Sequence, residues 1–197
     1  LGIIAAASLK LFPAPTTRFV AWLAVRGAEV LPDLLRTLQA RLGDAITSCE
    51  YISGGSLQFV LYNITSTKHP CGDGCAHYAL VEVSGFEPFD SFSEKCTGAL
   101  AYAEEQGLLD DAVIAQSENH AVELWRLRES IPRAEKLLGG SIKHDVSVSV
   151  SRVSDVISTA SKAVLAIEPR ARLSIYGHVG DGNVHFNILP PGSTNLE

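Results

Sequence analysis

The chain has 197 residues, of which 46% are hydrophobic and 19% charged, and this excludes a disordered or low-complexity protein. Its net charge of −6 argues against nucleic acid or an anionic membrane as the main partner. The sequence contains no methionine, so we expect the chain to be a fragment of a longer protein.

The first predicted element is an apolar strand. Residues 2–12 form an apolar run, interrupted by Lys10 and stopped by Pro13, which predicts a buried strand that leaves a domain upstream. The run is shorter than the roughly 20 apolar residues that a transmembrane helix needs. No basic region precedes it, as one would in a signal peptide. We therefore expect no transmembrane segment.

Strand and helix patterns then alternate along the chain. Segment 17–25 predicts a strand, and leucines spaced by three and four predict a helix over 28–42. The other predicted strands are 45–52, 78–86, 112–115, 143–150, 172–178 and 183–189. The other predicted helices are 91–106, one capped by Ser117 that ends or kinks at Pro132, and 153–167. Segment 56–63 is ambiguous. This order predicts an α+β fold, a ferredoxin-like antiparallel sheet with helices packed on one face.

The four cysteines are irregularly spaced and do not resemble a disulfide framework. We therefore expect a reducing compartment and a cytoplasmic location. One loop places His69, Cys71, Cys75 and His77 around a Gly-Asp-Gly turn at 72–74. These four side chains could bind Zn²⁺, although an ordinary hydrophilic turn is the simpler interpretation. The sequence leaves both interpretations open.

The most informative segment is 176–187, Tyr-Gly-His-Val-Gly-Asp-Gly-Asn-Val-His-Phe-Asn. Asp-Gly between two alternating runs predicts a hairpin with a two-residue type I′ turn at 181–182. In that register His178 lies opposite His185 on one face, and Tyr176 lies opposite Asn187.

Two imidazoles at that separation can bind one divalent metal, and zinc is the metal we expect. A catalytic zinc site has three protein ligands, so His178 and His185 are too few on their own. Within the chain only Asp145 is a candidate for the third ligand. The simpler interpretation is a cross-strand histidine pair without a metal.

Two cationic residues precede this hairpin. Arg128 follows Trp125, and Lys143 lies on the polar face of its predicted strand. A guanidinium can hold a carboxylate through two hydrogen bonds, and an ammonium adds a point charge. Taken alone, each would be read as an ordinary surface charge.

Three segments together carry a family resemblance: 125–129 (Trp-Arg-Leu-Arg-Glu), 143–148 (Lys-His-Asp-Val-Ser-Val) and 176–187. In this order they resemble the C-terminal, substrate-side domain of the FAD-linked oxidases. That family includes D-lactate dehydrogenase, the glycolate oxidase flavin subunit and D-2-hydroxyglutarate dehydrogenase. The resemblance spans nearly the whole chain. It implies that residues 1–15 are a remnant of an upstream FAD-binding domain and that 16–197 are a substrate-binding cap domain, truncated at its C-terminus.

The resemblance also implies roles for single residues. His178 and His185 match the two histidines that bind the divalent metal in the family. Arg128 and Lys143 match groups that hold the substrate carboxylate, and Asn187 matches a polar residue that faces the substrate.

Other positions match a segment near the cofactor or depart from the family. Gly2 and Ile4 match the segment whose backbone lies near the flavin. Pro132 stands where some relatives have a hydroxylic residue, which leaves the exact acid open. The family's Gly-Glu-His-Gly segment would supply the third metal ligand and a candidate base. It would lie beyond Glu197, so the catalytic base is unknown.

The function that this resemblance implies belongs to a longer parent protein. The chain would be a fragment of an FAD-dependent oxidoreductase that oxidises a small D-2-hydroxy acid by hydride transfer to flavin, with a divalent metal on the substrate hydroxyl. The isolated fragment should be inactive, and its exposed surface could pair into a homodimer. The alternative is a stand-alone ferredoxin-like module that binds a metal or a small acid as a regulator.

Overall fold

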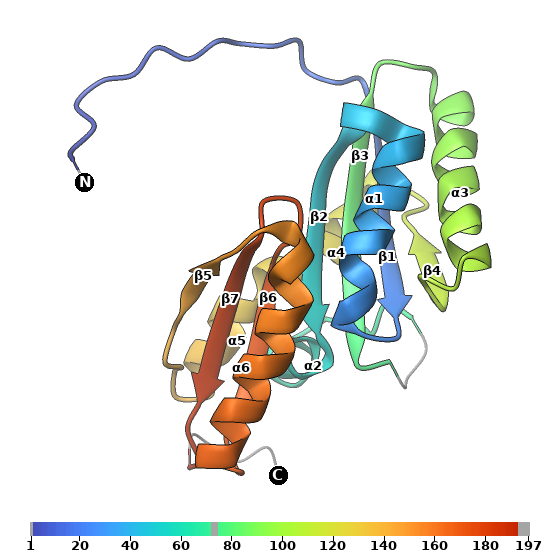
Figure 1. Ribbon diagram of the computed structural model, residues 1–197. Helices are drawn as coiled ribbons and strands as arrows, with labels where there is room; N and C mark the ends of the chain where they lie inside the picture. The colour runs from blue at the N-terminus through green and yellow to red at the C-terminus, as the bar shows by residue number, and fades with distance from the viewer. Residues whose placement is uncertain (1, 72–74, 193–197) are drawn as a thin grey trace.

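The structure is a computed structural model, and it describes residues 2–71 and 75–192. The described residues form one antiparallel sheet in the order β4-β1-β3-β2-β6-β7-β5 (Figure 1). The strands are β1 (Thr17–Val25), β2 (Ile46–Ser53), β3 (His77–Gly85), β4 (Asp111–Ile114), β5 (Asp145–Ser147), β6 (Arg172–His178) and β7 (Asn183–Leu189). The α-helices are α1 (Leu31–Leu42), α2 (Gly54–Asn63), α3 (Phe89–Glu105), α4 (Glu118–Glu129), α5 (Ile131–Leu137) and α6 (Val153–Ile167). Short 3₁₀ turns occupy Ala28–Val30, Gly43–Ala45 and Val150–Arg152.

The first half of the sheet has the predicted ferredoxin-like topology. Apart from α2, which lies between β2 and β3, the elements come in the order β1, α1, β2, β3, α3 and β4 along the chain, and their strands lie in the order β4-β1-β3-β2. This is the split βαβ arrangement, with every neighbouring pair antiparallel. Strands β6, β7 and β5 extend the same sheet beyond β2. The predicted α+β class and antiparallel sheet are therefore confirmed.

Helices cover both faces of the sheet, so the prediction that they pack on one face is wrong. Alternate residues of β1 show the reason. Phe19 and Leu23 pack in the core beneath α1, α3 and α6, whereas Val20 and Trp22 pack in a second core beneath α2, α4 and α5. Figure 1 shows the first set of helices in front of the sheet and the second set behind it. Because the central strands are apolar on both faces, both faces must be covered.

Local capping explains where several helices begin. The ambiguous segment is helix α2, whose N-cap Ser53 accepts a hydrogen bond from the backbone N–H of Ser56. Ser117 caps α4 in the same way through the N–H of His120, as predicted. The predicted break at Pro132 is also confirmed, because α4 ends at Glu129 and the proline lies in the first turn of α5.

Residues 2–15 form no strand, so the predicted buried strand at 2–12 is wrong. Their apolar side chains are exposed, 98% for Ile3 and 87% for Ile4. Figure 1 shows an extended arm that leads away from the sheet. A strand needs a partner for its backbone hydrogen bonds, and no described segment of this chain pairs with the arm.

The hairpin between β6 and β7 differs from its predicted register. Tyr176 pairs with His185 and His178 pairs with Asn183, so the loop has four residues, 179–182, instead of two. The cause lies on β2, where the carbonyl of Cys49 accepts a hydrogen bond from the N–H of Val179 at 2.8 Å. This bond keeps the chain along β2 after His178. A shift of two residues leaves both histidines on the predicted face.

Strand β5 is shorter than predicted, three residues instead of the eight at 143–150. It pairs only with the first three residues of β7, and Val150 begins a 3₁₀ turn. The predicted faces are nevertheless retained. Val148 packs against the core beneath α6, and Asp145 lies on the opposite side, beside His185.

The hairpin loop gives a first testable prediction. Gly182 has a φ of +73°, and a Cβ atom there would lie 1.8 Å from the carbonyl oxygen of Val148. We expect Gly182→Ala to lower the free energy of unfolding by about 2 kcal/mol or more, because both the conformation and the overlap are unfavourable.

A matched control lies in the same loop. A Cβ at Gly180 would meet nothing within 4 Å. We expect Gly180→Ala to change the free energy of unfolding by at most about 0.5 kcal/mol. Urea denaturation of the chain measures both changes. Equal effects of the two substitutions would contradict the close packing of this loop against Val148.

Candidate functional site

Polar side chains gather on the sheet face that α2, α4 and α5 cover, over strands β2, β6, β7 and β5. We call this group the polar cluster. It consists of Glu50, Arg128, Glu135, Lys143, Asp145, Tyr176, His178, His185 and Asn187. Its residues come from six separate elements and the loop before β5, and they include the predicted metal and substrate residues.

The two histidines of the polar cluster are close and similarly oriented by carboxylates. The ring centroids of His178 and His185 are 6.0 Å apart, with the planes at 72°. The Nδ1 atom of His178 pairs with Glu50, and the Nδ1 atom of His185 pairs with Asp145. A carboxylate partner favours a proton on Nδ1, which leaves the Nε2 lone pair of each ring for another partner.

These contacts do not show the predicted metal site. No group of three or more His, Cys, Asp or Glu side chains among the described residues is arranged to hold a metal ion. Asp145, the candidate third ligand, is engaged with the ring of His185. Two imidazoles with carboxylates behind them are the donors that zinc uses. The described chain thus fits two positions of such a site.

Arg128 is held by a buried carboxylate and an aromatic ring. Its Nε donates to Oε2 of Glu50 at 2.8 Å, and its guanidinium carbon lies 4.6 Å from the ring centroid of Tyr176. Among the described residues Arg128 donates no other side-chain hydrogen bond. Its terminal nitrogens are therefore available for a second carboxylate.

Lys143 is anchored by a second buried carboxylate. Its Nζ lies 2.7 Å from Oε2 of Glu135, which is 0% exposed, while the lysine side chain itself is 59% exposed. Glu135 also accepts hydrogen bonds from Ser141, Ser174 and Asn187. Burial raises the pKa of Glu135, but these donors outweigh burial and hold the pKa below its usual value.

Asn187 is buried beneath the surface of the polar cluster. Its amide nitrogen donates to Glu135 at 2.9 Å and contacts the hydroxyl of Tyr176 at 3.4 Å. The backbone N–H of His144 donates to its side-chain oxygen at 3.4 Å. Its polar atoms thus face other groups of the protein in this structure.

Tyr176 lies in the middle of the polar cluster. Its ring centroid is 4.9 Å from that of His185, and the guanidinium of Arg128 stacks on it. Burial, with a smaller contribution from Glu135, raises the pKa of Tyr176 to about 12. The phenol therefore stays protonated at neutral pH and can act only as a neutral hydrogen-bonding group.

Sequence reasoning missed the two buried carboxylates. Glu50 is the only charged residue in the apolar strand β2, and such an isolated charge is the signal that could have identified it. Glu135 lies four residues after Ile131 on the buried side of α5. A glutamate at an apolar helical position is the corresponding signal there.

The predicted cofactor residues lie apart from these elements. Gly2 and Ile4 belong to the exposed arm before β1, and no element that carries the polar cluster includes them.

The cysteine–histidine loop does not form a metal site among its described residues. His69 pairs with the carbonyl of Cys71 and, at 3.2 Å, with the hydroxyl of Tyr78. His77 instead pairs with the hydroxyl of Tyr51 at 2.7 Å, in the opposite core. Burial raises the pKa of the Cys71 thiol to about 11, which disfavours the thiolate that zinc binds. The turn at 72–74 lies outside the described residues.

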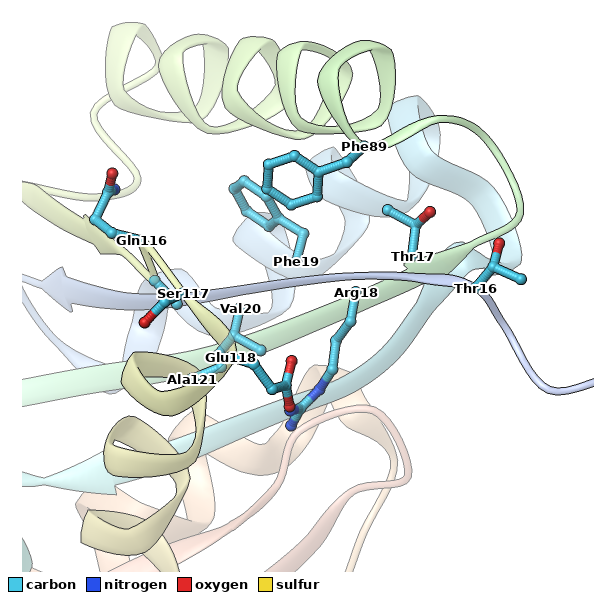
Figure 2. A pocket seen from close by; sticks show the side chains of 11 residues that line it. Thr16, Thr17, Arg18, Phe19, Val20, Phe89, Gln116, Ser117, Glu118 and Ala121 are labelled. Carbon is cyan, nitrogen blue, oxygen red and sulfur yellow. The ribbon is translucent and has the colours of Figure 1, made fainter.

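A separate cavity of about 260 Å³ lies on the β4–β1 side of the sheet. Figure 2 shows that Arg18 and Glu118 meet at one side of it, while Phe19 and Phe89 lie together at another. The two charges form an ion pair at 2.6 Å, and Arg18 also contacts Glu82 at 2.7 Å. Because its charges satisfy one another, this cavity offers less to a charged ligand than the polar cluster does.

Comparison with known proteins places this architecture in a family. Residues 14–195 match the family model described as FAD linked oxidases, C-terminal domain. The chain is 29% identical over 188 residues to the mitochondrial D-2-hydroxyglutarate dehydrogenase of Arabidopsis thaliana, covering 95% of this chain and 33% of that protein. It is 31% identical over 196 residues to the D-2-hydroxyglutarate dehydrogenase of Xanthomonas citri pv. viticola, covering 99% and 40%. The chain thus spans about a third to two fifths of these curated relatives.

Solved structures share the fold at low sequence identity. An alkyldihydroxyacetonephosphate synthase matches with a TM-score of 0.57 and 13% identity, covering 88% of this chain and 36% of that one. The 4-ethylphenol oxidase from Gulosibacter chungangensis matches with a TM-score of 0.54 and 14% identity, covering 92% and 40%. No described helix has the length and apolar character of a membrane span. The family model covers most of the sequence, and this chain therefore belongs to the FAD-linked oxidases, as their C-terminal domain.

Proposed function

We propose that residues 16–197 form the substrate-binding cap domain of an FAD-dependent dehydrogenase that oxidises a small D-2-hydroxy acid. In this proposal residues 1–15 belong to the flavin-binding domain upstream, and Gly2 and Ile4 lie near the flavin. The observation that best supports this proposal is that two imidazoles, each held by a carboxylate, and two cations lie together on one face of the sheet. Relatives named D-2-hydroxyglutarate dehydrogenases support the class of substrate.

The two cations would hold the carboxylate of the acid. Arg128 can offer its terminal nitrogens as a fork, because its Nε is already engaged by Glu50. Lys143 has an exposed side chain, and the contact with Glu135 uses only one of its three N–H donors. Together they would orient C2 of the substrate toward the flavin. Asn187 would support them from below, through Glu135.

The charge balance of the polar cluster supports a metal in the same site. Arg128 and Lys143 carry two positive charges, whereas three carboxylates contribute three negative charges, which leaves a net charge of −1. A negative site repels an anionic acid. A divalent cation would reverse the sign of this charge.

In the proposal, His178 and His185 would hold a divalent metal, zinc, through their Nε2 atoms. When bound, such an ion stabilises an alkoxide that develops on the substrate hydroxyl. The chain's own residues bind the acid and orient it, and the flavin of the parent protein accepts the hydride. The base and the third ligand are not assigned to this chain. The cytoplasmic location and the homodimer stay predictions.

The test uses the full-length parent protein. Mixing it anaerobically with D-2-hydroxy acids should bleach the flavin absorbance, and the L enantiomers should leave it unchanged. The 197-residue chain alone should bind no FAD and turn over no acid. A parent protein without flavin, or one whose flavin no hydroxy acid reduces, would contradict the proposal. Tight binding of metal or acid by the chain alone would instead favour a regulatory module.

A further inference from the structure

One buried carboxylate contacts both a proposed metal ligand and a proposed substrate-binding cation of the polar cluster. Glu50 lies on β2 directly across from His178 on β6, and it is 1% exposed. Its Oε1 pairs with Nδ1 of His178, and its Oε2 accepts from Nε of Arg128 at 2.8 Å. Each oxygen of one carboxylate thus contacts a different predicted functional residue.

Stability alone does not account for a charge at this position. The residues that follow Glu50 on β2 are buried, and Ile52 belongs to the same apolar core as Tyr176. Transfer of a carboxylate into such a place costs several kcal/mol, and a well-packed apolar residue is often as stable as a buried ion pair. What an apolar residue cannot do is orient an imidazole and a guanidinium.

The contact with His178 selects one tautomer of its neutral ring. A carboxylate can only accept, so the Nδ1 atom that faces Glu50 carries the proton. Nε2 of this tautomer keeps its lone pair, on a side chain that is 49% exposed. The opposite tautomer would remove the ligand that the metal needs.

The contact with Arg128 fixes the orientation of its guanidinium group. With Nε on Glu50 and the guanidinium plane over Tyr176, the side chain has little rotational freedom. The terminal nitrogens donate to no other side chain among the described residues, so their N–H groups remain for a carboxylate ligand.

We propose that Glu50 is a positioning residue that fixes the tautomer of His178 and the orientation of Arg128 at the same time. The inference rests on the proposed function, because that function assigns the metal to His178 and the substrate carboxylate to Arg128. It adds that one side chain links the two subsites, so that a change at Glu50 affects both.

Glu50→Gln in the full-length protein tests this directly. The glutamine oxygen can still accept from Arg128, but its amide then presents an N–H to His178. His178 should respond by accepting at Nδ1 and carrying its proton on Nε2. The imidazole nitrogen chemical shifts of the metal-free protein report this change of tautomer. Metal affinity should fall about 10- to 100-fold. KM for the acid should rise about tenfold, because a neutral amide oxygen holds the guanidinium of Arg128 less firmly than a carboxylate oxygen does.

Glu82→Gln is the matched control. Glu82 lies on the neighbouring strand β3 and accepts from Arg18 and from the indole nitrogen of Trp125, both at 2.7 Å. It is therefore another bridging glutamate, but outside the polar cluster. We expect its loss to lower stability and to leave the tautomer of His178, the metal affinity and KM unchanged.

A second variant covers the case in which Glu50→Gln does not fold. Aspartate keeps the charge but is one methylene shorter, so it cannot reach both partners. In Glu50→Asp we expect the tautomer of His178 to be retained while KM rises. An unchanged tautomer in Glu50→Gln, or unchanged KM in Glu50→Asp, would overturn the positioning role. Should Glu50→Gln change the tautomer while His178→Ala leaves metal content unaffected, the metal part of the proposed function fails and the positioning role stands.

Discussion

Replacing His178 by alanine in the full-length protein is expected to remove the bound metal and to lower kcat at least about 100-fold, since a metal on the reacting oxygen supplies several kcal/mol. His185→Ala should have the same effect. The two rings are 6.0 Å apart and each Nδ1 is engaged by a carboxylate, so both would present Nε2 to one ion. Elemental analysis and steady-state kinetics with D-2-hydroxy acids measure the two losses.

His120→Ala provides the matched control for these substitutions. His120 lies in the first turn of α4, where its Nδ1 accepts from the backbone N–H of Gln116. It belongs to no part of the polar cluster, so metal content and kcat should not change. Full metal content in both His178→Ala and His185→Ala would dismiss the metal site.

The sequence predicts those parts of the fold that depend on local patterns. The bounds of β1, α6, β6 and β7 agree with prediction to the residue, because alternation and helical periodicity are properties of neighbouring residues. The covering of both faces was not predicted, because it depends on where α2, α4 and α5 pack. The prediction of a strand at 2–12 was wrong for a similar reason, because an apolar run becomes a strand only beside a partner strand.

In the candidate site, too, local features were predicted and features that depend on distant contacts were not. The histidine pair was predicted because both residues lie in one short hairpin. Its register was not, since a hydrogen bond from Val179 to Cys49 on a distant strand lengthens the loop. Glu50 and Glu135 were missed because each acts on partners from other elements, which no local pattern reveals.

Loss of Glu135 should destabilise the fold, because its carboxylate is buried and accepts several hydrogen bonds. We expect Glu135→Ala to lower the free energy of unfolding by about 2–3 kcal/mol, because the buried donors around it lose their acceptor. Those donors include Lys143, Ser141 and Asn187. Glu135→Gln keeps the shape and should cost less. Urea denaturation at neutral pH measures both.

The pH dependence of the free energy of unfolding distinguishes the contribution of the Glu135 charge from that of its shape. Hydrogen bonds hold its folded pKa below the unfolded value of about 4.3, so the ionised form stabilises the fold fully above that pH. The stability difference between wild type and Glu135→Gln should stay constant between about pH 5 and 7 and shrink as pH falls through the folded pKa. Glu87→Gln, which loses only an exposed contact with Lys95 at 3.5 Å, should show a small difference throughout. A Glu135→Gln difference that grows toward low pH would mean that burial, and not the donors, controls this carboxylate. Because Lys143 and Asn187 share it, that result would also remove the physical basis for its holding both residues in place.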